Sequence, residues 1–156
     1  MEHSTVRNMW KDYLATLNEN ETDTKRRYSS WYFCDNKEDA DYLAELVVKD
    51  TKRATASLYL GYEYEKEEVP KAGDYCIITD WEGIAVCVIE VVKVDIVPYI
   101  EVTEEFAATE GEGDKSLEHW RKVHWEFFFR EMKILGKEPE EDMLVVCEEF
   151  RKVFSR

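Results

Sequence analysis

The segment KDTKRATASL, residues 49–58, holds residue types suited to nucleophilic catalysis, with Lys52 three positions ahead of Thr55. A threonine hydroxyl becomes a good nucleophile only when a neighbouring base takes its proton. A lysine can be that base if burial or an adjacent cation lowers its pKa, and Arg53 is such a cation. Alternation predicts a strand with Arg53, Thr55 and Ser57 on one face. Lys52 has the opposite parity, so it shares a pocket with Thr55 only if it lies in the loop before the strand.

Acidic residues gather in the segment TEGEGDKS, residues 109–116. The glycines at positions 111 and 113 free the backbone around Glu112, which helps when a carboxylate must be aimed. This carboxylate would hold the Lys52 ammonium or deliver a proton to a leaving amine, and Glu110 is the second choice. Asp114 or Ser116 can cap a following helix, whose first N–H groups would face a ligand oxygen. The alternative, solvated acid ahead of a helix, accounts for Asp114 but poorly for the glycines.

Ring side chains extend the candidate site. Trp31 could stack on a base, because aromatic planes bind bases without reading sequence, and core packing is the alternative. His124 follows the apolar stripe of a predicted helix and could reach the same pocket. His119 and His124 are five residues apart on that helix and point about 140° away from each other, so they cannot ligate one ion from the same face. We therefore expect no metal and no cofactor.

Apolar residues at helical spacing predict the helices that must position these groups. Residues 4–17 form the first helix, with Ser4 or Thr5 as its N-cap, and an exposed aromatic face on this helix would suggest a homodimer. A polar connection, residues 18–30, follows. Asp35 and Glu38 form a capping-box pattern at the start of a second helix that runs to about residue 48. A third helix begins near residue 116.

Strands are predicted between these helices. Residues 53–60 alternate, residues 61–74 read as an acidic loop, and residues 74–94 read as a hairpin that turns at Gly83. The predicted register places Cys76 opposite Val88 and Ile78 opposite Val86. Both faces of this hairpin are apolar, which indicates that it is covered on both sides, as in a small closed barrel. Shorter strands are expected near residues 31–33 and 97–102, and a closing strand at residues 144–154.

Composition bounds the class of protein. The 156 residues fit one domain, in which residues 1–29 form an N-terminal helical extension. The element order predicts an α+β fold: a small, mostly antiparallel β-barrel flanked by helices, with an N-terminal helix. The net charge of −14 gives no general footprint for duplex nucleic acid, so any such contact must be local and short. The four isolated cysteines indicate reduced thiols, and the absence of a long apolar run predicts a cytoplasmic protein without a membrane partner.

Three long segments resemble the ASCH-domain family, whose fold is similar to the PUA barrel. The segments are WYFCDNKEDADYLAELVVKDTKRATASLYLGYE, VPKAGDYCIITDWEGIAVCVIEVVKVDIVPY and FAATEGEGDKSLEHWRKVHWEFF. The resemblance covers about residues 30–130. The chain departs from the family at two positions. Asp50 stands where the family usually has glycine in a Gly-x-Lys signature, and Cys34 stands where a glycine often follows the aromatic. Aspartate tolerates a left-handed backbone at a cost that glycine avoids.

The resemblance implies two classes of function. Several ASCH-domain proteins are RNA-interacting modules, a ribonuclease activity is attributed to one relative, and one branch hydrolyses the acetyl amide of N4-acetylcytidine with a Lys, a Thr and a Glu. That branch's residues fall on Lys52, Thr55 and Glu112, with Glu110 as the second choice for the acid. We therefore expect a nucleotide, modified nucleoside or short single-stranded RNA as the ligand. Its pocket would be formed by Trp31, residues 52–57, residues 110–116 and His124. The alternative is a non-catalytic RNA-binding or protein-interaction module.

Overall fold

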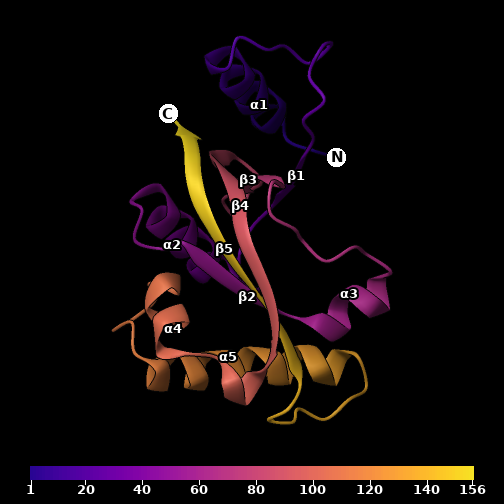
Figure 1. The fold of residues 1–156 in the computed structure, drawn as a ribbon, viewed down its shortest axis with the longest axis vertical. Helices are drawn as coiled ribbons and strands as arrows, with labels where there is room; N and C mark the ends of the chain where they lie inside the picture. Colours follow the sequence, from indigo (N-terminus) through magenta and orange to yellow (C-terminus); the bar gives the residue numbers. More distant parts are fainter.

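One five-stranded sheet organises the chain, with strand order β1-β3-β4-β5-β2 (Figure 1). The computed structural model describes residues 1–156. Strand β1 pairs in parallel with β3, and the other three pairings are antiparallel. The strands are β1 (Tyr28–Trp31), β2 (Ala54–Leu58), β3 (Tyr75–Thr79), β4 (Ala85–Pro98) and β5 (Leu144–Ser155). The α+β class and the mostly antiparallel sheet are confirmed, but the sheet is not closed into a barrel, because β1 and β2 are its two unpaired edges.

Three predicted helices are confirmed: α1 (Ser4–Thr16), α2 (Lys37–Val48) and α5 (Leu117–Ile134). Their caps differ in part from the prediction. The N-cap of α1 is His3 rather than Ser4 or Thr5, and the N-cap of α2 is Asn36, whose side chain accepts from the amide of Asp39. Ser116, one of the two expected candidates, caps α5. No helix in the chain is both long enough and apolar enough to cross a bilayer.

Two short helices were not predicted: α3 (Tyr59–Glu65) and α4 (Glu104–Glu110). Each spans seven residues, which is too short for a helical period to stand out from the flanking acidic sequence. Helix α3 starts where strand β2 ends, so the strand expected to reach residue 60 stops at Leu58. Strand β4 runs without interruption to Pro98, and the separate strand expected at residues 97–102 is instead its end followed by a 3₁₀ turn at Tyr99–Glu101.

The β3–β4 hairpin has a different register from the predicted one. Cys76 lies opposite Ile89 and Ile78 opposite Cys87, one residue away from the expected partners. The cause is an irregularity at Ile78 and Thr79, which shifts the ladder near the turn. A one-residue shift exchanges the face of β4 that lies beside a given face of β3. Cys76 and Ile78 therefore share the side toward α2 with Cys87 and Ile89, and Ile77 shares the side toward α1 with Val88.

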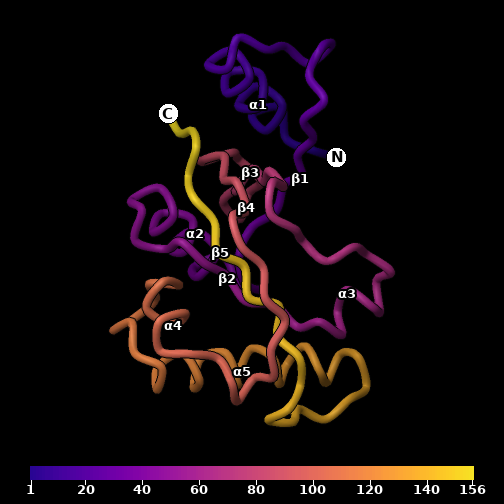
Figure 2. Tube along the Cα trace, in the orientation of Figure 1, coloured from indigo at the N-terminus to yellow at the C-terminus, as the bar shows by residue number.

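The core consists of three hydrophobic clusters, one under each of the long helices. Helix α1 lies at the end of the molecule where β5 finishes, and α4 and α5 lie at the opposite end (Figure 2). Trp10 and Tyr13 of α1 are buried against Tyr28 and Tyr75, with ring centroids 5.0 to 5.8 Å apart. The aromatic face that would have suggested a homodimer is therefore part of the core.

Candidate functional site

A buried lysine is the centre of the candidate site. The side chain of Lys52 is 1% exposed, and its Nζ lies 2.8 Å from Glu112 Oε1 and 3.2 Å from Glu110 Oε2. The same Nζ donates to the carbonyl oxygen of Ala54 at 2.7 Å. An ammonium has three N–H donors, so all of them are engaged by protein oxygens. It also lies 5.1 Å from the centre of the Phe33 ring, within the range of a cation–π contact.

The turn after α2 delivers Lys52 to this position. The amides of Thr51 and Lys52 both donate to the carbonyl oxygen of Leu46, at 2.9 and 3.1 Å, and β2 begins two residues later. Lys52 therefore lies in the loop before the strand. This is the position from which its side chain can reach the same pocket as that of Thr55, although the two residues would point to opposite faces of a regular strand. Gly111 approaches this turn so closely that a Cβ there would lie 2.0 Å from the Thr51 carbonyl oxygen. This close approach is the physical reason for a glycine beside Glu110.

Glu110 is more deeply held than Glu112. It is the last residue of α4 and is 1% exposed, and its Oε1 accepts from Trp120 Nε1 at 3.0 Å. Its Oε2 lies 3.3 Å from His124 Nε2, and His124 Nδ1 lies 2.9 Å from the carbonyl oxygen of Trp120. Both ring nitrogens of His124 face oxygen acceptors, which favours the doubly protonated imidazolium. The rings of Trp120 and His124 stack, with centroids 4.1 Å apart.

The pKa values within this cluster move in different directions. Burial disfavours the charged form of Lys52, but Glu110 and Glu112 outweigh it and raise the lysine's pKa. Burial also opposes ionisation of Glu110, yet Lys52 and His124 hold the pKa of that carboxyl below its usual range. Burial raises the pKa of Glu112, and the charge of Glu110 reinforces the rise against the pull of Lys52. Of the two carboxyls, Glu112 is therefore the more readily protonated, whereas Lys52 stays an ammonium.

A cavity of about 720 Å³ opens beside this cluster. Its walls come from the β1–α2 loop, α2, β2, the α4–α5 loop and α5, so segments far apart in the sequence meet there. The candidate residues Thr55, Glu110, Glu112 and His124 line it, and Lys52 lies behind the two glutamates. The other lining residues are Phe33, Cys34, Asp35, Asn36, Asp39, Tyr42, Leu43, Ala56, Gly113, His119, Val123, Glu126, Phe127 and Arg130.

Five predicted substrate contacts lie outside this cavity, and three of them are Trp31, Arg53 and Ser57. Trp31, on edge strand β1, packs edge-on against Phe33 with centroids 4.8 Å apart. Arg53 is exposed, and only its backbone is engaged, with the amide bonded to Thr109 and the carbonyl to Phe150. The hydroxyl of Ser57 lies 2.9 Å from that of Tyr62 on α3, a local hydrogen bond of the kind expected on an ordinary strand face.

Asp114 and Ser116 serve the start of α5 rather than the cavity. Asp114 Oδ1 accepts from the amide and the hydroxyl of Ser116, at 2.9 and 2.6 Å. Ser116 Oγ in turn accepts from the amide of His119. Neither residue lines the cavity, so the expectation that this helix start holds a ligand oxygen finds no support in the geometry. Four other residues that line the cavity, Phe33, Tyr42, Phe127 and Arg130, were not predicted as site residues. The sequence offered only an aromatic or basic side chain in or beside a predicted element, which does not identify a site.

Glu110, Glu112 and His124 also have the chemistry of a metal site. One ligand atom from each of them lies within 4.8 Å of the others. The Lys52 ammonium occupies the space that two carboxylates would otherwise offer to a cation, at 2.8 and 3.2 Å from their oxygens. A metal ion would have to displace this buried ammonium, so the residues present fit an ion pair better than a metal centre.

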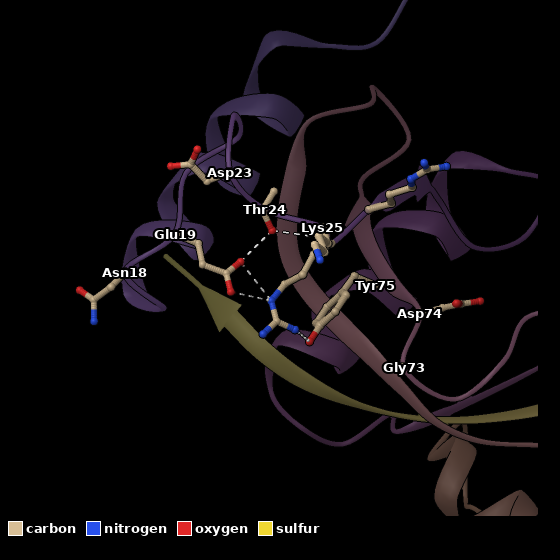
Figure 3. A pocket seen from close by; sticks show the side chains of 10 residues that line it. Asn18, Glu19, Asp23, Thr24, Lys25, Gly73, Asp74 and Tyr75 are labelled. Carbon is tan, nitrogen blue, oxygen red and sulfur yellow. Dashed lines mark hydrogen bonds and ion pairs between the residues drawn. The ribbon is translucent and has the colours of Figure 1, made fainter.

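A second cavity, of about 660 Å³, lies beside the N-terminal connection (Figure 3). It contains the basic run at residues 25–27 together with the start of β3. Arg26 is not free to bind an anion there, because its Nε lies 3.2 Å from Glu19 and its guanidinium donates to the Tyr75 hydroxyl at 2.9 Å. None of the predicted site residues lines this cavity.

The protein is therefore an α+β domain with an open five-stranded sheet and a cavity beside a buried lysine. The chain belongs to the ASCH-domain family, whose model matches residues 29–154. The crystal structure of an ASCH domain from Lactobacillus crispatus JV V101 is 38% identical, with a TM-score of 0.90 over 97% of this chain and 96% of that one. A comparison with curated proteins finds no match.

Two further solved structures are similar. Protein EF3133 from Enterococcus faecalis V583, assigned to the family model DUF984, is 33% identical, with a TM-score of 0.84 over 95% of this chain and 87% of that one. Hypothetical protein PH0355 is 21% identical, with a TM-score of 0.51 over 80% of this chain and 96% of that one. The second likeness concerns the fold alone.

Both departures from the family's glycines fall at left-handed residues. Asp50 has φ = 59° and Cys34 has φ = 64°, so each adopts the backbone conformation for which glycine is the usual choice. The sequence-based expectation that aspartate would tolerate this conformation at position 50 is confirmed. The turn that presents Lys52 therefore forms without glycine.

Asp50→Gly is expected to leave the fold intact and to raise the free energy of unfolding by no more than about 1 kcal/mol, since relief of the left-handed strain is partly offset by greater unfolded-state freedom. Asp50→Val is the matched opposite, and we expect it to lower the free energy of unfolding by about 1–2 kcal/mol, because a β-branched residue fits this conformation badly. Urea unfolding of the three proteins measures both effects. Equal stability of the glycine and valine variants would contradict a left-handed turn at position 50.

Proposed function

We propose that this ASCH-domain protein binds a modified nucleoside, a nucleotide or a short single-stranded RNA in the cavity beside Lys52, and that it hydrolyses the amide of an acylated nucleobase such as N4-acetylcytidine. The observation that carries the proposal is that Thr55 and Glu112, from two segments far apart in the sequence, line one cavity, and that Lys52, three residues before Thr55, pairs with Glu112 behind the cavity wall. The resemblance implies these positions for the Lys, Thr and Glu of the amidohydrolase branch, with Glu110 as the second choice for the acid.

Cavity size and charge favour a small, neutral ligand. A volume of about 720 Å³ lies within the range of roughly 300–1,000 Å³ common for small-molecule sites. Five acidic residues line the cavity: Asp35, Asp39, Glu110, Glu112 and Glu126. The one lining arginine, Arg130, is paired with Asp35 at 3.0 Å. Phosphate groups would be repelled by this lining, so a nucleoside is favoured over a long RNA.

The proposed roles differ in one respect from those expected from the sequence. Thr55 remains the nucleophile: its oxygen bonds to the acyl carbon, the carbon–nitrogen bond breaks, and water later releases the acid from the threonine ester. Glu112 remains the proton donor to the leaving amine, a role that suits a carboxyl with a raised pKa that lines the cavity. Lys52 is not the base, because its pKa is raised and its three donors are engaged. It acts as a fixed cation that orients Glu112.

Turnover of N4-acetylcytidine tests the proposal, with chromatography following the release of cytidine and acetate. We expect turnover of the free nucleoside, and slower turnover of the same nucleoside placed in a short RNA, because the acidic lining repels phosphates. An absence of cytidine at high protein concentration would overturn the hydrolase proposal. If a short single-stranded RNA is then bound, the chain is a binding module, and if that RNA is cleaved, it is a ribonuclease.

A further inference from the structure

We infer that Glu148 on strand β5 is the general base that takes the proton of the Thr55 hydroxyl. This inference rests on the proposed function, because it assigns the step for which Lys52 is unsuited. Glu148 is an ionisable residue that the sequence did not predict as part of the site, and it forms no hydrogen bond or ion pair with the cluster around Lys52.

Strand pairing places Glu148 beside Thr55. The two residues are direct partners in the antiparallel ladder between β2 and β5. Direct partners project from the same face of a sheet, with Cβ atoms about 4.5–5.5 Å apart. A glutamate side chain spans such a distance to a neighbouring hydroxyl oxygen with a change of rotamer. The two side chains are not hydrogen-bonded in the resting structure, and catalytic hydrogen bonds commonly form only when the substrate is bound.

Glu148 is unusual among the buried acids because no protein group holds it. The residue is 5% exposed and has no side-chain hydrogen bond or ion pair, whereas Glu110, which is 1% exposed, has three. The one fully enclosed side-chain atom without a partner is Arg121 Nε, so both Glu148 oxygens still reach solvent. The Thr55 hydroxyl is likewise free of protein partners, and Thr55 lines the cavity. Base and nucleophile are therefore both uncommitted.

The surroundings of Glu148 suit a base that works near neutral pH. Burial raises its pKa to about 7, and Asp74, ahead of β3, adds to the rise, while Lys52 opposes it. The other titratable groups near it are Tyr62 on α3, Cys76 on β3 and the adjacent Cys147 on β5. Burial raises the pKa of all three, so all are uncharged at neutral pH. A carboxyl with this pKa is about half ionised at pH 7, which is the condition for efficient proton acceptance.

With Glu148 and Glu112 in these roles, every proton that is transferred during the reaction is returned by its end. As the Thr55 oxygen bonds to the acyl carbon, its proton passes to Glu148, and the leaving amine takes a proton from Glu112 as the carbon–nitrogen bond breaks. Water then attacks the threonine ester and gives a proton to Glu112. The Thr55 oxygen leaves with the proton returned by Glu148, so one amide and one water become one amine and one acid.

The test compares the wild type with Glu148→Gln, which keeps the shape of the side chain but cannot accept the proton. We expect kcat/KM for N4-acetylcytidine to fall by roughly 10²–10⁴-fold. In the wild type, kcat/KM should rise with pH through about 7, and this limb should be missing from the variant. Glu148→Asp should keep the limb at a reduced rate. Glu149→Gln, which changes the next residue on the strand, a partner of Lys93, is the control with wild-type kinetics.

The possible outcomes separate the two proposals. Turnover by the wild type together with unchanged kinetics and an unchanged pH profile in Glu148→Gln overturns the role of Glu148 and leaves the hydrolase intact. A wild type without turnover overturns both. Loss of activity through unfolding is distinguished by thermal melts above pH 7, where Glu148→Gln should be at least as stable as the wild type, because the variant no longer buries an unpaired charge.

Discussion

Lys52→Met is expected to lower the free energy of unfolding by about 3–5 kcal/mol at pH 7, because removing one partner of a buried ion pair leaves the other charge uncompensated. The effect is large at this position, since the 1% exposed side chain of Lys52 carries an ammonium that pairs with both Glu110 and Glu112. Methionine has a similar length and keeps the packing of the chain. Urea unfolding followed by fluorescence of the tryptophans measures the change.

The sign of the pH dependence gives this prediction a second readout. In the wild type, the lysine and histidine hold the pKa of Glu110 low, so this carboxylate contributes stability above the usual glutamate pKa and loses it as the pH falls through its lower folded value. In Lys52→Met, the carboxylates that have lost the ammonium take up protons more readily. The difference in free energy of unfolding between the wild type and the variant should therefore become smaller as the pH falls toward about 5. Lys49→Met is the control, because this exposed lysine pairs only with Glu45 at the surface. A Lys52→Met variant within 1 kcal/mol of the wild type at pH 7 would contradict a charged buried cluster.

Thr55→Val is expected to reduce the rate of cytidine release by at least about 10³-fold, because removal of a nucleophile leaves only the contributions of binding and electrostatics. Valine has the shape of threonine and a high strand preference, so β2 and the cavity wall should be preserved. Thr55→Ser keeps a hydroxyl and should retain measurable turnover. Initial rates over a range of substrate concentrations measure the effect, which we expect in kcat rather than in KM.

Ser57→Ala is the matched control for this prediction. Ser57 lies on the same strand, but its hydroxyl is bonded to Tyr62 and it does not line the cavity. Its variant should turn over substrate as the wild type does. Loss of activity in Ser57→Ala with retention in Thr55→Val would move the nucleophile to the Ser57–Tyr62 pair and contradict the assignment of Thr55.

Local patterns predicted the longer elements because each buries a face with a regular period. Helices α1, α2 and α5 and the strands of the central hairpin were located in this way. Helices α3 and α4 were missed because two turns of helix in an acidic segment carry no period. The β3–β4 register was wrong by one residue because an irregularity at Thr79 cannot be read from alternation. Barrel closure was wrong because it depends on whether two edge strands meet, which no local pattern reports.

The sequence predicted a set of residues sharing one pocket, but not the contacts between their side chains. Lys52, Thr55 and Glu112 were selected from the chemistry of their side chains and from the resemblance to a family. The sequence could not show that Glu110 is the more deeply buried acid, since its partners Trp120 and His124 come from another helix. It could not show Glu148 beside Thr55 either, because that contact depends on the register between β2 and β5.

We propose that the acyl amide is bound in the cavity that Thr55 and Glu112 line, beside the buried Lys52. A crystal structure of Thr55→Val, which cannot form the threonine ester, in complex with N4-acetylcytidine tests it most directly. We expect the nucleoside in the cavity of about 720 Å³, with its acyl carbon about 3–3.5 Å from the side chain of residue 55, the distance of a near-attack geometry. The leaving nitrogen should face Glu112. A nucleoside bound in the second cavity beside residues 25–27, or an empty Lys52 cavity at saturating concentration, would contradict the account.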